Sequence, residues 1–153
     1  MENNNSVTLR DITRENFNEC VRLDVRDDQR TFVASNVYSI AQTTVEPTYT
    51  AQAVYHGDEL VGFCMYGYDA DEDCYCVGRL MIDKNHQGRG FGRAAVVEAI
   101  RRMRERPDCR EIALSVAPQN TAAQKLYESL GFVKTGELSH GEEVMRLRFD
   151  GEQ

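Results

Sequence analysis

The chain has 153 residues, 41% hydrophobic and 28% charged, which suffices to bury the core of one globular domain. Its formal net charge of -7 disfavours a nucleic-acid-binding protein and mildly favours cationic ligands through electrostatic attraction. Without an apolar run of roughly 18 residues or a signal-peptide pattern, we expect one cytoplasmic domain over residues 6–150, with neither a membrane nor a nucleic-acid partner.

The cysteines suggest neither a disulfide framework nor a metal site. Their number is odd, and the close pair Cys74 and Cys76 lacks the second cluster that a zinc site needs. In an extended segment these two side chains share one face of a strand. We therefore expect free thiols and no bound metal at the five positions Cys20, Cys64, Cys74, Cys76 and Cys109.

Apolar residues that alternate predict strands, and apolar residues at three- to four-residue steps predict helices. Strands are expected at residues 7–10, 49–55, 60–66, 75–82, 111–116, 132–137 and 144–149. One helix is expected to begin near Thr13, and the others to cover residues 31–42, 89–105 and 121–130. The second and third strands form a hairpin through residues 56–58, and residues 68–73 form a polar loop. This order predicts one α/β domain with a mixed sheet.

Three glycines alternate with other residues in Gln87-Gly88-Arg89-Gly90-Phe91-Gly92, between a predicted strand and a predicted helix. The N–H groups at a helix start attract anions, and glycines let a pyrophosphate approach the backbone closely. Arg89 and Arg93 supply further positive charge. The run therefore predicts a phosphate-binding loop, although a glycine-rich helix start without a ligand would have the same pattern.

Two other phosphate motifs do not fit this loop. The P-loop requires Lys and then Ser or Thr after its last glycine, but Arg93 and Ala94 follow Gly92. The dinucleotide fingerprint requires G-x-G-x-x-G and an acidic residue at the end of the next strand, which here ends Ser115-Val116-Ala117. The spacing instead resembles the Q/R-x-x-G-x-G/A signature of the GNAT superfamily of acetyl-CoA-dependent acetyltransferases.

A second segment that resembles this family runs from Asn120 to Phe132, with Asn, Ala, Leu-Tyr and Gly-Phe in the family's order. On its own, Asn120 is a good helix N-cap and Tyr127 a good amphipathic core residue. Seven residues are almost two helical turns, so both lie near one side of the helix. The resemblance implies that Asn120 touches the pantetheine arm of acetyl-CoA, that Ala122 and Ala123 belong to the same site, and that Tyr127 faces the thioester sulfur.

The resemblance also implies a fold: a mixed, mostly antiparallel sheet flanked by helices, in which the strand before the loop splays from its parallel neighbour. In that arrangement backbone groups of Leu80, Met81 and Ile82 pair with pantetheine and offer an N–H to the thioester carbonyl, where an oxyanion develops. Tyr127 would then act as the general acid for the departing thiolate.

The general base is open in the sequence. Gly78, whose place within a strand indicates a bulge or a close approach, stands where some polyamine acetyltransferases carry a glutamate base. A water chain to a carboxylate is the alternative, and Glu142 and Glu143 near the last hairpin are candidates.

Over its whole length the chain looks like bacterial spermine/spermidine N-acetyltransferases, at residues 7–10, 29–39, 61–63, 78–83, 135–137 and 142–145. We therefore expect a polyamine amine as acceptor, with Asp28, Glu46 and Glu142 as candidate substrate-binding residues. Asp27 and the acidic residues 71–73 are further candidates, although residues 69–73 also fit a solvated loop. An acetyltransferase for a protein N-terminus or an aminoglycoside and a non-catalytic acetyl-CoA-binding domain are the alternatives. The family is often dimeric, so a homodimer is plausible.

Overall fold

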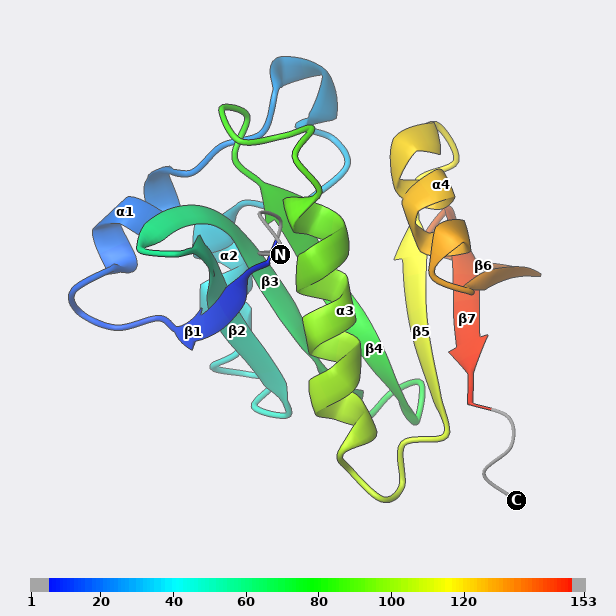
Figure 1. Ribbon diagram of the computed structural model, residues 1–153. Coiled ribbons are helices and arrows are strands. Elements are labelled where there is room, and N and C mark those ends of the chain that lie inside the picture. The colour runs from blue at the N-terminus through cyan, green and yellow to red at the C-terminus, as the bar shows by residue number, and fades with distance from the viewer. Residues whose placement is uncertain (1–5, 150–153) are drawn as a thin grey trace.

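The computed structural model describes residues 6–149. Figure 1 shows their secondary structure, in which the predicted helices and strands follow one another in the predicted order, with one added 3-10 helix, η1. The elements are β1 (Thr8–Asp11), α1 (Phe17–Arg22), η1 (Asp27–Gln29), α2 (Asn36–Gln42), β2 (Tyr49–His56), β3 (Glu59–Asp69), β4 (Cys74–Ile82), α3 (Phe91–Arg104), β5 (Glu111–Val116), α4 (Thr121–Ser129), β6 (Val133–Ser139) and β7 (Glu142–Arg148).

The strands form one seven-stranded sheet in the order β1-β2-β3-β4-β5-β7-β6. The pair β4 and β5 is parallel, and every other neighbouring pair is antiparallel. The predicted mixed, mostly antiparallel sheet is therefore confirmed. No helix within residues 6–149 combines the length and the apolar character needed to cross a membrane.

Helices cover the two faces of the sheet, and each face has its own core (Figure 1). Side chains of α3 and α4 pack on one face against β5 and β7; this core includes Val96, Ala99, Leu114, Tyr127 and Met145. Side chains of α1 and α2 pack on the other face against β2 and β3; this second core includes Cys20, Ile40, Ala53, Phe63 and Met81. Alternate residues of one strand enter different cores because strand side chains point to opposite faces.

The parallel strands β4 and β5 splay apart. They pair only at Tyr75 with Ile112 and at Cys76 with Ala113. Beyond this point β4 bulges, because the register with β3 moves from Val77 to Arg79 and leaves Gly78 without a partner. A Cβ on Gly78 would lie 3.1 Å from side-chain atoms of both Met65 and Tyr49. The predicted bulge and the predicted splay are therefore present.

The structure corrects three predicted boundaries. The second helix was expected from Thr31, but α2 begins at Asn36, because extended backbone at Ser35 caps it: the Ser35 hydroxyl oxygen accepts from the N–H of Tyr38 at 3.1 Å. Strand β3 runs on to Asp69, into the expected polar loop, because it stays paired with β4. Helix α3 begins at Phe91 rather than Arg89, since the left-handed backbone of Gly90 precedes it.

The cysteines are free thiols, as predicted. Cys74 in β4 and Cys64 in β3 have thiols whose pKa values shift in opposite directions. A hydrogen bond with Cys76 and the positive charge of Arg146 lower the pKa of the Cys74 thiol below its ordinary value. Burial raises the pKa of the Cys64 thiol to about 12, so that this group stays protonated at neutral pH.

Candidate functional site

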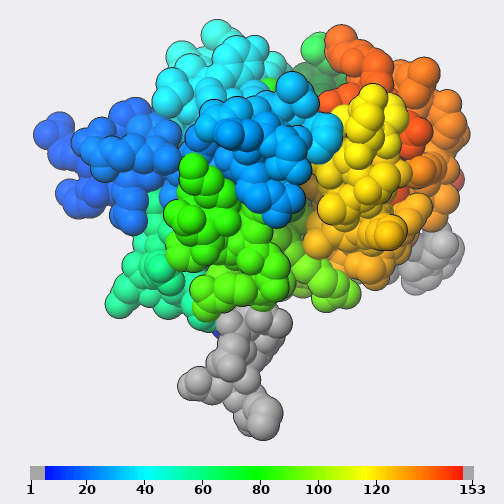
Figure 2. Space-filling view, turned by 90° about the horizontal axis from the view of Figure 1, so that it is seen from above, coloured from blue at the N-terminus to red at the C-terminus, as the bar shows by residue number. Residues whose placement is uncertain are grey.

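A pocket of about 810 Å³ opens where β4 and β5 splay. Its walls come from β4, the start of α3, the end of β5, α4, and the segment between residues 25 and 34. Figure 2 shows this last segment, in lighter blue, against the green loop before α3 and beside the yellow start of α4. The predicted site residues that line the pocket are Leu80, Met81, Ile82, Gln87, Gly88, Gly90, Phe91, Gly92, Arg93, Asn120, Ala122, Ala123, Tyr127 and Glu142.

The glycine loop forms the start of α3. Gly88 and Gly90 both adopt left-handed backbone, with φ of 82° and 84°, which explains why glycine occupies these two positions. The first N–H groups of a helix have no acceptor within the helix and carry its positive dipole end. Because α3 begins at the pocket wall and Arg93 also lines it, the loop fits an anionic group such as a pyrophosphate.

Arg89 and Gln87 differ from the rest of the loop. Arg89 does not line the pocket, and its guanidinium lies over the Phe91 ring at 4.7 Å. The Gln87 side chain turns inward, where its Nε2 donates to the Ile82 carbonyl oxygen at 2.9 Å and to Gln29 Oε1 at 2.9 Å. The structure thus gives Gln87 protein partners for its amide.

The register of β4 fixes which backbone groups face the splay. The N–H of Asp83 donates to the Val61 carbonyl oxygen at 2.8 Å. Hydrogen-bonded residues alternate along an antiparallel ladder, so Met81 directs its backbone groups to β3. Leu80 and Ile82 therefore direct theirs to the open side, toward β5. Of the three predicted strand residues, Leu80 and Ile82 offer backbone groups to the pocket, and Met81 contributes its side chain to the lining.

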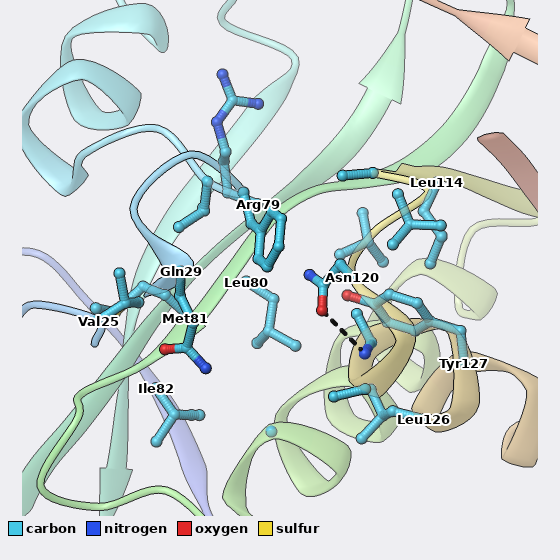
Figure 3. A pocket seen from close by; sticks show the side chains of 18 of the residues that line it. Val25, Gln29, Arg79, Leu80, Met81, Ile82, Leu114, Asn120, Leu126 and Tyr127 are labelled. Carbon is cyan, nitrogen blue, oxygen red and sulfur yellow. Dashed lines mark hydrogen bonds between the residues drawn. The ribbon is translucent and has the colours of Figure 1, made fainter. Parts of the chain in front are cut away.

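Asn120 and Tyr127 lie on the pocket side of α4. The Asn120 Oδ1 accepts from the N–H of Ala123 at 3.2 Å, so Asn120 is the N-cap that its residue type favours. This bond leaves its Nδ2 directed into the pocket, and Figure 3 shows the Tyr127 hydroxyl beside it, facing Leu80 across the cavity. The oxygen of Asn120 therefore caps the helix, as its residue type predicts, while the nitrogen faces the pocket and leaves the predicted contact with pantetheine open.

Tyr127 is almost fully buried, and burial raises the pKa of its hydroxyl to about 12. Its ring contacts Phe132 edge to face, with the ring centroids 5.8 Å apart. Within residues 6–149 the hydroxyl has no hydrogen-bond partner. A neutral, buried phenol that faces the cavity is suited to donate a proton to a group bound there.

Glu142 is the one predicted carboxylate that reaches the described pocket lining. Its Oε1 accepts from the hydroxyl of Ser115 at 2.9 Å. Ser115 and His140 line the same part of the cavity, and Arg79 lines it from β4. The Arg79 guanidinium donates to Gln42 Oε1 at 3.0 Å and to the carbonyl oxygen of Gly78 at 2.9 Å, so protein acceptors hold it.

The other predicted carboxylates lie elsewhere. Asp28 pairs with Arg26 at 3.4 Å, and Glu46 accepts from the side-chain amide of Gln42 at 2.9 Å. Glu143 pairs with Lys134 at 3.3 Å. None of these three lines the pocket, nor do Asp27 or residues 71–73. They had been chosen for charge alone, and the strand alternation at β7 turns Glu143 away from the side that Glu142 faces.

The wall formed by Thr31, Phe32, Val33 and Ala34 was not predicted as part of the site, although residues 29–39 belong to the family resemblance. Their apolar spacing predicted a helix face, and the structure uses them as an irregular segment beside the cavity. Gln29 was also missed as a pocket residue. The serine cap at Ser35 was the one signal that could have separated this segment from α2.

Comparison with known proteins identifies the family of the chain. Residues 8–132 match the model of the acetyltransferase (GNAT) family, and the chain belongs to that family. It is accordingly an acetyl-CoA-dependent N-acetyltransferase. The chain is 31% identical over 147 residues to the spermine/spermidine N(1)-acetyltransferase of Bacillus subtilis (strain 168), a match that covers 92% of this chain and 97% of the relative.

Two solved structures share the fold. The spermidine N-acetyltransferase from Vibrio cholerae, in complex with CoA and spermine, superposes with a TM-score of 0.71 at 21% identity, covering 92% of this chain and 93% of that one. The PaiA N-acetyltransferase from Thermoplasma acidophilum, in complex with coenzyme A, gives a TM-score of 0.70 at 16% identity, covering 94% of this chain and 99% of that one.

Proposed function

We propose that the enzyme transfers the acetyl group of acetyl-CoA to a primary amine of a polyamine such as spermidine, spermine or a diamine. The observation that carries this proposal is the match to a spermine/spermidine N(1)-acetyltransferase over nearly the full length of both chains. The net charge of -7 supports it, because an acidic protein attracts a polycation over distance.

The cosubstrate site consists of the glycine loop before α3 and the facing edges of β4 and β5 where these strands splay apart. The backbone N–H groups at the start of α3, with Arg93, bind the pyrophosphate. The Asn120 amide and the outward backbone groups of β4 hold the pantetheine arm. This assignment places the thioester between Leu80 and Tyr127, whose side chains face each other across the cavity (Figure 3).

Acetyl transfer joins the amine nitrogen to the carbonyl carbon and breaks the bond from that carbon to sulfur. The outward N–H of Leu80 stabilises the negative charge that develops on the carbonyl oxygen. Tyr127 donates its proton to the departing sulfur, and its raised pKa keeps that proton available at neutral pH. The ammonium form of the amine first loses one proton through water toward Glu142. After attack the nitrogen releases a second proton, which passes through water to the Tyr127 phenolate, so that the amide, the CoA thiol and neutral Tyr127 are formed.

Glu142 also contributes negative charge to the acceptor end of the pocket. The hydroxyl of Ser115 fixes one carboxylate oxygen, so the other is available for an ammonium group. A polyamine carries several ammonium groups, so one nitrogen can pair with Glu142 while another, neutral nitrogen reacts. A carboxylate in this position favours a cationic acceptor over an anionic one.

A thiol-release assay across an amine panel tests the proposal. Purified enzyme and acetyl-CoA are incubated with spermidine, spermine, diamines, aminoglycosides and short peptides, and the rates of CoA release are compared. We expect the highest kcat/KM with a polyamine. Highest turnover on peptides or aminoglycosides would refute the polyamine assignment and leave the acetyltransferase chemistry intact. Acetyl-CoA binding without thiol release from any amine would indicate a non-catalytic domain.

A further inference from the structure

The side-chain amides of Gln29 and Gln87 bind each other across two walls of the pocket. Gln87 Nε2 donates to Gln29 Oε1 at 2.9 Å, and Gln29 Nε2 donates to Gln87 Oε1 at 3.3 Å. Gln87 opens the glycine loop, Gln29 ends η1, and both residues line the pocket. This reciprocal pair joins the loop that holds the cosubstrate to the segment that precedes α2.

Each glutamine is also bound to its own wall. Gln29 Oε1 accepts from the N–H of Arg26 at 3.0 Å, which closes the turn of η1, and the Gln29 carbonyl oxygen accepts from the N–H of Phe32 at 2.9 Å. Gln87 Nε2 donates to the carbonyl oxygen of Ile82 at the end of β4. The pair therefore connects the end of β4 with the backbone that positions Phe32.

Few other hydrogen bonds hold the wall from Thr31 to Ala34. Upstream, the N–H of Asp24 donates to Asp83 Oδ1 at 3.0 Å, and the N–H of Lys84 donates to the Asp24 carbonyl oxygen at 2.8 Å. Within the described chain, the bond from the N–H of Phe32 to Gln29 is the one hydrogen bond made by residues 31–34. Val33 packs against the core beneath α1 and α2, and the hydrogen bonds that position this wall are those of Gln29 at one end and of the α2 cap at the other.

We propose that Gln29 is a positioning residue that couples the cosubstrate loop to the acceptor wall, so that acetyl-CoA binding strengthens amine binding. When acetyl-CoA binds at the loop, it fixes the backbone of Gln87. The side-chain amide of Gln87 then loses less conformational entropy when it forms hydrogen bonds with Gln29. By linkage, the amine strengthens acetyl-CoA binding by the same factor. The inference rests on the proposed function in one respect: the acceptor amine binds in the same pocket that residues 31–34 line.

Two substitutions separate the hydrogen bonds from the volume of the side chain. Gln29→Met keeps an unbranched side chain of similar length and removes both bonds to Gln87, together with the bond from the N–H of Arg26. Gln29→Glu keeps the acceptor for Gln87 Nε2 and for the N–H of Arg26, and loses only the longer bond. The substitution Gln87→Met removes the same two hydrogen bonds by changing the side chain of Gln87 instead of that of Gln29.

The affinity for the best acceptor of the amine panel is measured calorimetrically with and without CoA, alongside kcat and KM for each substrate. Coupled sites typically differ in affinity by about 5- to 150-fold, and for two neutral hydrogen bonds we expect a coupling of about 5- to 10-fold. Gln29→Met should abolish this coupling and raise the acceptor KM by the same factor. Gln29→Glu should restore most of the coupling.

An unchanged coupling in Gln29→Met would overturn the inference, and so would a Gln29→Glu variant as impaired as Gln29→Met. The effects of Gln29→Met and Gln87→Met should be less than additive when combined, and strictly additive effects would also overturn it. Hydrogen exchange of residues 27–34 tests the coupling without an acceptor: CoA should slow exchange in the wild type and not in Gln29→Met. A failed polyamine assignment leaves this last test intact, so the two proposals fail separately.

Discussion

Substitution of Tyr127 by phenylalanine removes one hydroxyl and little else. The ring keeps its packing against Phe132, and no protein group within residues 6–149 loses a hydrogen bond. The variant should therefore melt within about 2 °C of the wild type. Its affinity for CoA should be unchanged, because the proposed role of the hydroxyl is confined to the departing sulfur.

The expected loss of turnover follows from the environment of the phenol. A positioned proton donor contributes about 10²- to 10⁴-fold when its pKa lies near the working pH. Burial raises the pKa of Tyr127 to about 12, so the proton is always present but is donated less readily. We therefore expect kcat to fall by about 10- to 100-fold, which corresponds to about 1.4 to 2.7 kcal/mol in activation free energy.

The assay is steady-state CoA release with saturating acetyl-CoA, alongside a melting curve. Tyr75→Phe is a matched control, because Tyr75 lies outside the pocket and its hydroxyl donates to Asp108 at 2.9 Å. Its kcat should match the wild type. A folded Tyr127→Phe protein with full turnover would refute the role of Tyr127 as general acid.

Three further predictions concern pH, the acceptor and the thiols. The pKa of Tyr127 is raised to about 12, so Tyr127 keeps its proton over the whole working pH range. Below the pKa of the substrate amine, kcat/KM should therefore rise about tenfold per pH unit as the amine loses its proton. A fall of kcat/KM between pH 8 and 10 would contradict this. Glu142→Gln should raise the KM for spermidine by about tenfold, leave that for acetyl-CoA unchanged, and lower kcat, because Glu142 receives the amine proton. Glu143→Gln, outside the pocket, should alter none of these, and equal effects of the two substitutions would argue against Glu142. Iodoacetamide near neutral pH should label Cys74 before Cys64, since the pKa of Cys74 is lowered and that of Cys64 raised; peptide mapping that finds equal labelling would refute this order.

The parts of the site that short-range chemistry determines were predictable from the sequence. Gly88 and Gly90 occupy left-handed backbone, and Asn120 caps α4, so glycine and asparagine at these positions signal the loop and the helix start directly. The bulge at Gly78 was predictable for the same reason. The resemblance to the GNAT family supplied the splay, which no local pattern encodes.

The features of the site that could not be predicted from the sequence depend on long-range packing. The apolar spacing of Phe32, Val33 and Val37 suits a helix, but Ser35 begins a new one, and Phe32 and Val33 line the pocket instead. Gln29 becomes a pocket residue only because the chain brings it against Gln87, which is 58 positions away. Charge alone could not separate Glu142 from Glu143, since the alternation of side chains along β7 decides which carboxylate faces the cavity.

The most direct test of the proposed function is mass spectrometry of the product formed from spermidine and acetyl-CoA. With the wild-type enzyme we predict spermidine carrying one acetyl group on a primary nitrogen, formed in equal amount to the CoA released, and much more slowly with Tyr127→Phe. CoA release without acetylated spermidine, or no product while an amine of another class is acetylated rapidly, would contradict the account.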